Sequence, residues 1–167
     1  YKFMKNLIFI VAYNHENFIS SVLERLPEEI KNSDFHILVI DDASEDNTFN
    51  TAINWANKNK NIGITVLKNI KNLGYGGNQK SCYNKALELN ADIVIMLHPD
   101  YQYTPKLIRA MSSVISEGNY KVVFGSRILG KGALKGGMPI YKYIANRILT
   151  LFQNILINQK LKKNWKI

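Results

Sequence analysis

Three side chains that could hold a metal ion stand at alternate positions near residue 100. His98, Asp100 and Gln102 follow directly after the apolar run Ile93–Leu97. A divalent cation typically binds one or two carboxylates and completes its shell with phosphate oxygens and water, and imidazole suits Mn²⁺ better than Mg²⁺. The spacing therefore indicates a site for Mg²⁺ or Mn²⁺ around Asp100. An equally simple interpretation is a strand-to-helix turn in which Asp100 only caps the next helix.

Polar groups that suit a nucleotide follow other apolar runs. Asp41 and Asp42 end one run, and carboxylates accept hydrogen bonds from sugar hydroxyls and ring N–H groups. Gly74 opens a glycine cluster that allows close backbone approach to a phosphate or sugar, although the cluster lacks the lysine of a P-loop. Arg127 could neutralise a diphosphate. Together these groups indicate a site for a metal-bound nucleoside diphosphate that carries a further chemical group.

Apolar runs and helical spacings alternate along the chain, which predicts strand–helix repeats. We expect strands over 6–12, 35–40, 62–67, 93–97 and 120–125. We expect helices over 16–30, 105–117 and 139–158. Two more helices should begin near Ser44 or Asp46 and after Asn78. Thr104 and Pro105 are the expected N-cap and first-turn proline of the helix at 105–117. This order predicts an α/β fold with a mostly parallel sheet. The polar clusters then meet at the carboxyl edge of the sheet, where such sheets bind ligands.

Composition and charge restrict the function classes. The net charge of +9, from 22 Lys+Arg against 13 Asp+Glu, favours anionic partners such as nucleotide phosphates or acidic lipids. No recognisable nucleic-acid motif is present, so we expect no nucleic-acid partner. The single cysteine excludes an intramolecular disulfide. Neither a signal peptide nor an apolar run near the roughly 18 residues of a membrane span is visible, so we expect a cytoplasmic protein.

The character of the chain changes near residue 130, so we divide it into domains 1–130 and 131–167. The second part holds a basic glycine loop, an amphipathic helix and a lysine-rich tail. The helix either packs as a core helix or lies in a membrane interface with its basic end on anionic headgroups, at the inner face of the membrane. Because the chain opens on Tyr1 and not on Met, we expect a trimmed chain or a fragment.

Five motifs, in order, resemble those of glycosyltransferase family 2. Residues 10–16 resemble V-P-A-Y-N-E, 39–48 resemble V-D-D-G-S-x-D-x-T, 72–78 resemble N-x-G-x-G, 98–102 take the place of D-A-D-L-Q, and 125–127 match G-S-R. Jointly these motifs are specific, and they span roughly residues 7 to 157. The most similar branch is that of dolichol-phosphate mannose synthase and related polyprenyl-phosphate glycosyltransferases.

The resemblance implies a GT-A fold, which is Rossmann-like, and a role for each matching residue. The nucleotide would be bound by Ala12, Tyr13, Glu16, Asp41, Asp42 and Gly74. The metal would be held by Asp100, Gln102 and His98; Asp100 and Arg127 would be catalytic, and Arg147 would lie near an acceptor phosphate. His98 departs from the family, which has an aspartate there. The family also continues past the interface helix, whereas this chain ends at Ile167.

The implied activity is inverting transfer of a sugar from a nucleotide-diphosphate sugar to a polyprenyl (dolichyl-type) phosphate or a glycan acceptor, in cell-envelope glycan synthesis. One alternative is a catalytically impaired or truncated module that binds a sugar nucleotide or a lipid. A second is a nucleotidyltransferase, which would normally carry a glycine-rich basic loop after its first strand. Residues 13–16 hold Tyr-Asn-His-Glu in that place.

Overall fold

The protein consists of two compact units, Tyr1–Val123 and Phe124–Ile167. The computed structural model describes residues 5–31, 35–100, 103–125, 134 and 137–156. The domain boundary expected after residue 130 lies outside these ranges. Each unit is described by itself below.

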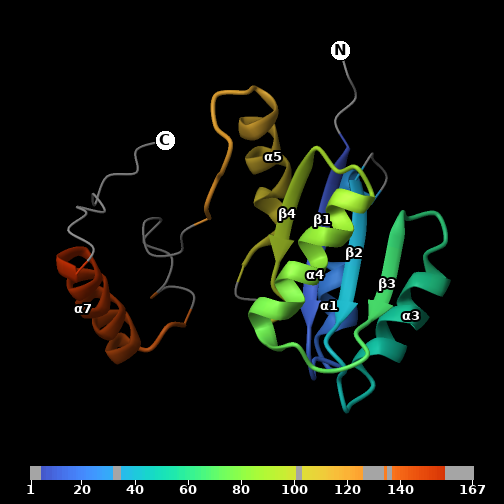
Figure 1. Cartoon of the computed structure of the whole chain (residues 1–167), viewed down its shortest axis with the longest axis horizontal. Helices are drawn as coiled ribbons and strands as arrows, with labels where there is room; N and C mark the ends of the chain where they lie inside the picture. The colour runs from blue at the N-terminus through green and yellow to red at the C-terminus, as the bar shows by residue number, and fades with distance from the viewer. Residues whose placement is uncertain (1–4, 32–34, 101–102, 126–133, 135–136, 157–167) are drawn as a thin grey trace. The chain divides into compact units, whose positions relative to one another are not determined.

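The first unit is built on a parallel sheet of four strands in the order β3-β2-β1-β4 (Figure 1). The strands are β1 (Asn6–Ala12), β2 (Phe35–Asp41), β3 (Ile64–Lys68) and β4 (Ile93–Leu97). All three strand pairs are parallel. The central strand β1 is apolar and buried from Leu7 to Ala12, because helices cover both faces of a parallel sheet of this kind. The predicted α/β fold class is confirmed.

Side-chain alternation along β1 and β2 divides the core into two layers. Leu7, Phe9 and Val11 pack with Cys82 and Ala86 of helix α4 (Gly74–Glu88), which crosses the front of the sheet in Figure 1. The intervening residues of β1 pack on the opposite face against α1 (Ile19–Glu24), α2 (Glu28–Lys31), α3 (Thr48–Lys58) and the start of α5 (Ile108–Ser116). The period of two that puts successive side chains on opposite faces also governs the functional residues at the strand ends.

Two helices differ from their predicted bounds for local reasons. The helix expected over 16–30 is split into α1 and α2 around Pro27, which has no N–H to continue the helical ladder. Helix α4 starts at Gly74, earlier than expected. Gly74 adopts a left-handed φ of 71°, which suits a glycine at the turn into the helix, and its N–H bonds to Asn72 Oδ1 at 2.8 Å. A Cβ at Gly77 would lie 2.6 Å from the Leu73 Cβ, so this first turn is closed tightly.

The helix start after β4 agrees with its prediction. Thr104 accepts a hydrogen bond from the Lys106 N–H, and Pro105 opens a 3-10 turn, Pro105–Leu107, that leads into α5. The cap is thus supplied by Thr104.

The fifth strand predicted over 120–125 is wrong. These residues are coil and bend, and Tyr120 and Phe124 are 57% and 83% exposed. A segment rich in apolar and β-branched residues forms a strand only where it can pair with a neighbouring strand or pack against a buried face. Among the described residues, only β1 pairs with β4.

The second unit contains α7 (Ile140–Leu156), close to the predicted helix at 139–158. None of its residues is buried, and its large apolar side chains are exposed: Ile140, Tyr141, Ile144, Ile148, Leu149, Leu151, Phe152, Ile155 and Leu156. Within the described ranges, every helix is too short or too polar to cross a membrane.

Cys82 should be almost inert in the folded protein. Burial in the α4 layer, with the Asp42 carboxylate nearby, raises the pKa of its thiol to about 12 from an ordinary 9.0. Thiolate is the reactive species, so we expect the native thiol to react with a disulfide reagent at least about a thousandfold more slowly than the unfolded chain. Stopped-flow reaction with and without urea measures the ratio. Equal rates would contradict the packing of α4 on the sheet.

His36 should make the first unit less stable in mild acid. Its Nε2 lies 2.9 Å from the Thr65 Oγ1, and burial, with a smaller effect of Lys5, lowers the pKa of His36 below 6.5. The folded state therefore binds fewer protons at His36 than the unfolded state, and the free energy of unfolding falls as the pH drops below about 6.5. Urea unfolding between about pH 7.5 and pH 5.5 should show this slope. The slope should be flatter in His36→Gln, and an unchanged slope would refute the assignment.

Candidate functional site

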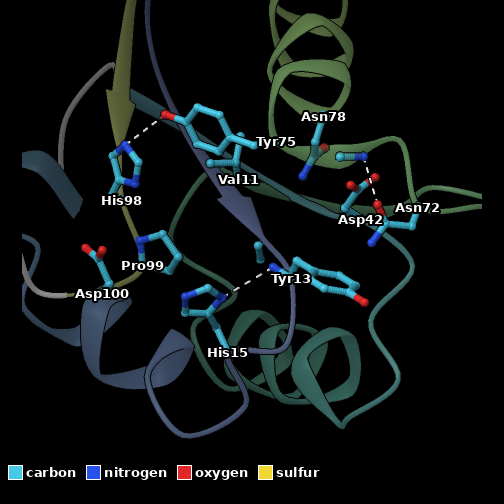
Figure 2. A pocket seen from close by; sticks show the side chains of 12 residues that line it. Val11, Tyr13, His15, Asp42, Asn72, Tyr75, Asn78, His98, Pro99 and Asp100 are labelled. Atoms are coloured by element: carbon cyan, nitrogen blue, oxygen red, sulfur yellow. Dashed lines mark hydrogen bonds between the residues drawn. The ribbon is translucent and has the colours of Figure 1, made fainter.

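A cavity of about 410 Å³ opens at the carboxyl edge of the sheet. Its walls come from the ends of β1, β2 and β4 and from the start of α4 (Figure 2). The lining residues are Val11, Ala12, Tyr13, His15, Asp42, Asn72, Gly74, Tyr75, Asn78, His98, Pro99 and Asp100. Segments that are far apart in the sequence thus meet at one rim, as the strand order requires.

The neighbouring aspartates at the end of β2 project to opposite sides. Asp41 is fully buried, and it accepts hydrogen bonds from the Ser44 hydroxyl and from the Ser44 N–H at 3.1 Å. Lys68 lies 3.6 Å from the Asp41 Oδ2. Asp42 instead lines the cavity, and its Oδ1 accepts from Asn69 Nδ2 at 2.7 Å and from the Leu73 N–H at 3.0 Å. Asp41 therefore holds the loop after β2, whereas Asp42 holds the loop before α4 and faces the ligand space.

The loops after β1 and β2 are joined by reciprocal hydrogen bonds. The N–H groups of Asn14, His15 and Glu16 donate to Ser44 Oγ, Thr48 Oγ1 and Asp46 Oδ2, and those of Glu45 and Asn47 donate to Asn14 Oδ1 and Glu16 Oε2. Burial alone would raise the pKa of Asp46, but hydrogen bonds from Thr48 and Glu16, with His15 nearby, lower it. The two loops therefore form one rigid wall. Left-handed φ values of 54° at Asn14 and 57° at Ala43 make the sharp turns.

Buried amides support the opposite wall at the start of α4. Asn78 is 2% exposed and donates from Nδ2 to the Ile40 carbonyl at 2.9 Å. Its Oδ1 accepts from Asn69 at 3.3 Å, and Asn69 also donates to Asp42. This network positions Gly74 on the cavity wall.

His98, directly after β4, contacts two tyrosine rings. Its ring stacks on that of Tyr75 with a centroid distance of 5.7 Å, and the Tyr103 ring lies at 5.3 Å. The Tyr75 hydroxyl lies 3.1 Å from the His98 Nε2, and a dashed line marks this contact in Figure 2. Burial raises the pKa of the Tyr75 hydroxyl, and Tyr103, Tyr83 and Asp100 add to the shift. The half-buried Asp100 lies on the same wall beyond Pro99.

The structure brings together six of the candidate residues. Ala12, Tyr13, Asp42, Gly74, His98 and Asp100 line the one cavity. Asp41 and Glu16 are not on its wall, since their carboxylates bond to Ser44 and to the Asn47 N–H. Gln102 and Arg127 lie outside the described residues, and Arg147 belongs to the second unit. The roles assigned to all of these residues stay predictions.

Sequence reasoning missed several wall residues, among them His15, Asn72, Tyr75 and Asn78. All four stand inside motifs that had been recognised, so their places after β1 and before α4 were the available signal. What the sequence did not reveal is which side chain of each motif turns inward. At residues 15 and 16, His15 lines the cavity and Glu16 turns to the neighbouring loop.

The side chains at the cavity wall suit a cation whose coordination shell also includes phosphate oxygens. No group of three or more acidic, histidine or cysteine side chains that could hold a metal exists within the described ranges. Asp100 supplies one carboxylate at the cavity wall. One carboxylate with phosphate oxygens and water is a normal shell for Mg²⁺ or Mn²⁺. The residues therefore fit a metal that arrives with a diphosphate.

The motifs match a family model across almost the whole chain. The model for glycosyl transferase family 2 matches residues 7–166. The chain belongs to this family. The resemblance seen in the five motifs is thereby confirmed, and the matched range includes every candidate residue.

Curated relatives agree with this membership. The chain is 36% identical over 146 residues to an uncharacterised protein of Methanocaldococcus jannaschii, covering 85% of this chain and 55% of the relative. It is 31% identical over 159 residues to the UDP-N-acetylglucosamine–dolichyl-phosphate N-acetylglucosaminyltransferase of Methanococcus voltae. This match covers 89% of this chain and 62% of the relative. The chain thus spans somewhat more than half the length of these relatives.

A solved structure shares the fold. Glucosyl-3-phosphoglycerate synthase from Mycobacterium tuberculosis, in complex with Mn²⁺, UDP-glucose and phosphoglyceric acid, matches with a TM-score of 0.54 and 19% identity. The match covers 70% of this chain and 41% of that one. It confirms the predicted GT-A fold.

Proposed function

We propose that this chain carries the donor-binding part of an inverting glycosyltransferase that uses a nucleotide-diphosphate sugar. The observation that carries the proposal is the convergence of Asp42, Gly74 and Asp100 on one cavity at the carboxyl edge of the sheet. Asp42 supplies an acceptor for the nucleoside, Gly74 allows close approach to the sugar nucleotide, and Asp100 supplies a carboxylate where a diphosphate and a cation can share a shell.

Asp100, with Gln102, would hold Mg²⁺ or Mn²⁺ against the diphosphate. A cation there supplies stabilisation of the charge that develops on the leaving diphosphate. Arg127 would add a fixed positive charge to the same group. The wall formed by the joined loops at Asn14–Glu16 and Ser44–Thr48 would hold the nucleoside end in place while the sugar is transferred.

The acceptor we propose is a polyprenyl phosphate. The relative from M. voltae is a transferase that acts on dolichyl phosphate. A phosphate nucleophile is already anionic, so it needs little help from a general base. The exposed apolar side of α7 suits a membrane interface beside the acceptor lipid, with Arg147 toward its phosphate. The protein would then be peripheral at the inner face of the membrane.

A thermal-shift screen of nucleoside diphosphates and sugar nucleotides, with and without Mn²⁺, tests donor binding. Ligands that prefer the folded state raise its melting temperature, by an amount that grows with ligand concentration above the dissociation constant. We expect a shift with at least one sugar nucleotide, and a larger shift with Mn²⁺. No shift with any member of the panel would overturn the proposal.

A donor-binding module without turnover is the second candidate. It is favoured by His98, which stands where the family has an aspartate. Transfer of radiolabelled sugar from the bound donor to a polyprenyl phosphate distinguishes the two candidates. Binding without transfer selects the module.

A further inference from the structure

The ring of His98 is held by a chain of hydrogen bonds that leads from the core to the cavity. Gln79 donates from Nε2 to the Sδ of Met96 at 2.9 Å and to the Tyr75 hydroxyl at 3.4 Å. The Tyr75 hydroxyl in turn lies 3.1 Å from the His98 Nε2. Met96 belongs to β4, whereas Tyr75 and Gln79 lie one helical turn apart on α4. The chain of bonds thus joins two elements that flank the cavity.

The direction of each hydrogen bond follows from the groups involved. If the Gln79 amide were turned over, its oxygen would face a thioether sulfur, which has no proton to donate. The amide nitrogen therefore points to Met96 and Tyr75, and the Tyr75 oxygen accepts from it. In a chain of hydrogen bonds each accepted bond strengthens the next donated one, which favours donation from the Tyr75 hydroxyl to the His98 Nε2 over the reverse direction.

A ring nitrogen that accepts a hydrogen bond carries no proton of its own. In the tautomer that this direction favours, neutral His98 carries its proton on Nδ1. A metal needs a nitrogen lone pair, and the only lone pair of this tautomer, on Nε2, is already taken by Tyr75. Because His98 lines a cavity suited to phosphate, its Nδ1–H group can serve instead as a donor to an anionic oxygen.

We propose that His98 donates a hydrogen bond from Nδ1 to an oxygen of the bound nucleoside diphosphate and does not ligate the metal, and that Tyr75 and Gln79 are positioning residues that fix this tautomer. The inference rests on the proposed function, whose ligand it takes as given. It revises the prediction that His98 is a metal ligand and leaves Asp100 as the wall carboxylate for the cation.

The tautomer can be measured without any ligand. Long-range ¹H–¹⁵N correlation spectra of the histidine rings distinguish a protonated Nδ1 from a protonated Nε2, and the His98 signals are assigned by their loss in His98→Asn. We expect a protonated Nδ1 in the wild type and a shift toward the other tautomer in Tyr75→Phe. Tyr83→Phe, on the same helix with its ring on Phe9, is the matched control and should change nothing. A protonated Nε2 in the wild type would overturn the inference.

Binding of UDP and GDP, measured by calorimetry in EDTA and again in Mn²⁺, tests the role. In EDTA, His98→Ala should weaken binding of the preferred nucleotide by about tenfold, the usual effect of losing a hydrogen bond to a charged group. His98→Asn, which keeps an N–H near the place of Nδ1, should lose less. The ratio of affinities with and without Mn²⁺ should be the same in His98→Ala as in the wild type.

The outcomes separate this inference from the proposed function. If the wild type binds neither nucleotide under either condition and no member of the thermal-shift panel either, the proposed function falls. If the wild type binds and His98→Ala binds equally well in EDTA, or loses the Mn²⁺ enhancement, only the donor role of His98 falls. Melting temperatures of the variants, recorded alongside, identify any variant whose fold is impaired, and for such a variant the ligand-free spectrum of the wild type decides.

Discussion

Replacing Asp42 by alanine should both destabilise the first unit and weaken nucleotide binding strongly. The Asp42 Oδ1 accepts from Asn69 Nδ2 and from the Leu73 N–H, and the residue is 2% exposed. Removing a buried acceptor leaves those donors unpaired, which costs about 2–3 kcal/mol of the free energy of unfolding. The loop before α4 then loses its anchor, and we expect nucleotide affinity to fall by about a hundredfold. Urea unfolding and calorimetry measure the two effects.

Glu45→Ala is the matched control for this prediction. Glu45 is an exposed carboxylate in the same loop, and the hydrogen bond that it makes to Asn14 comes from its backbone N–H, which alanine retains. Stability and binding should therefore stay close to those of the wild type. If Asp42→Ala has the same stability and nucleotide affinity as Glu45→Ala, Asp42 does not anchor the loop before α4.

Replacing Asp100 by asparagine should remove the effect of the metal while leaving the fold intact. Asp100 supplies the carboxylate on the wall formed by the end of β4, and the side chain is only half-buried. Loss of a group that merely orients a metal ligand costs about 10- to 100-fold in metal affinity, so loss of the ligand itself should cost at least as much. We expect Mn²⁺ to stop enhancing nucleotide affinity, and transfer to fall by about 10²- to 10³-fold.

Asp92→Asn provides the comparison at the other end of the same strand. Asp92 accepts from the Lys5 N–H through Oδ2 at the amino edge of the sheet, away from the strand ends that form the cavity. Its variant should keep the full Mn²⁺ enhancement. An Asp100→Asn protein that still shows the enhancement would place the cation elsewhere.

The features that the sequence predicted well depend on periodicity and on strand ends. Strand β4 was predicted with its observed bounds because five apolar residues stop at His98. The gathering of Asp42, Gly74 and Asp100 at one rim followed from parallel pairing alone. Asp42 comes directly after β2, Gly74 follows the loop after β3, and Asp100 follows β4, so all three stand at the carboxyl edge of the sheet. The five motifs then identified the family, which the family model confirms.

The features that the sequence did not predict depend on contacts between distant residues. Asp41 and Glu16 were assigned to the nucleotide site through the family motifs. Asp41 instead bonds within the loop after β2, and Glu16 bonds to that same loop. Alternation along β2 could have separated Asp41 from Asp42, because residues 38 and 40 face α4 and residues 37 and 39 face the other layer. The bond from Tyr75 to His98, by contrast, has no local signature, since it links residues 23 positions apart.

The most direct test of the central claim is the paramagnetic effect of Mn²⁺ on the amide spectrum of the protein with a bound nucleoside diphosphate. A cation and a diphosphate that share the cavity should broaden the amide signals of residues at its wall, including Tyr13, Tyr75 and Asp100. Signals at the amino edge of the sheet, such as those of Asn6 and Phe35, should survive. Broadening centred on that edge, or broadening that is the same without the nucleotide, would contradict the account.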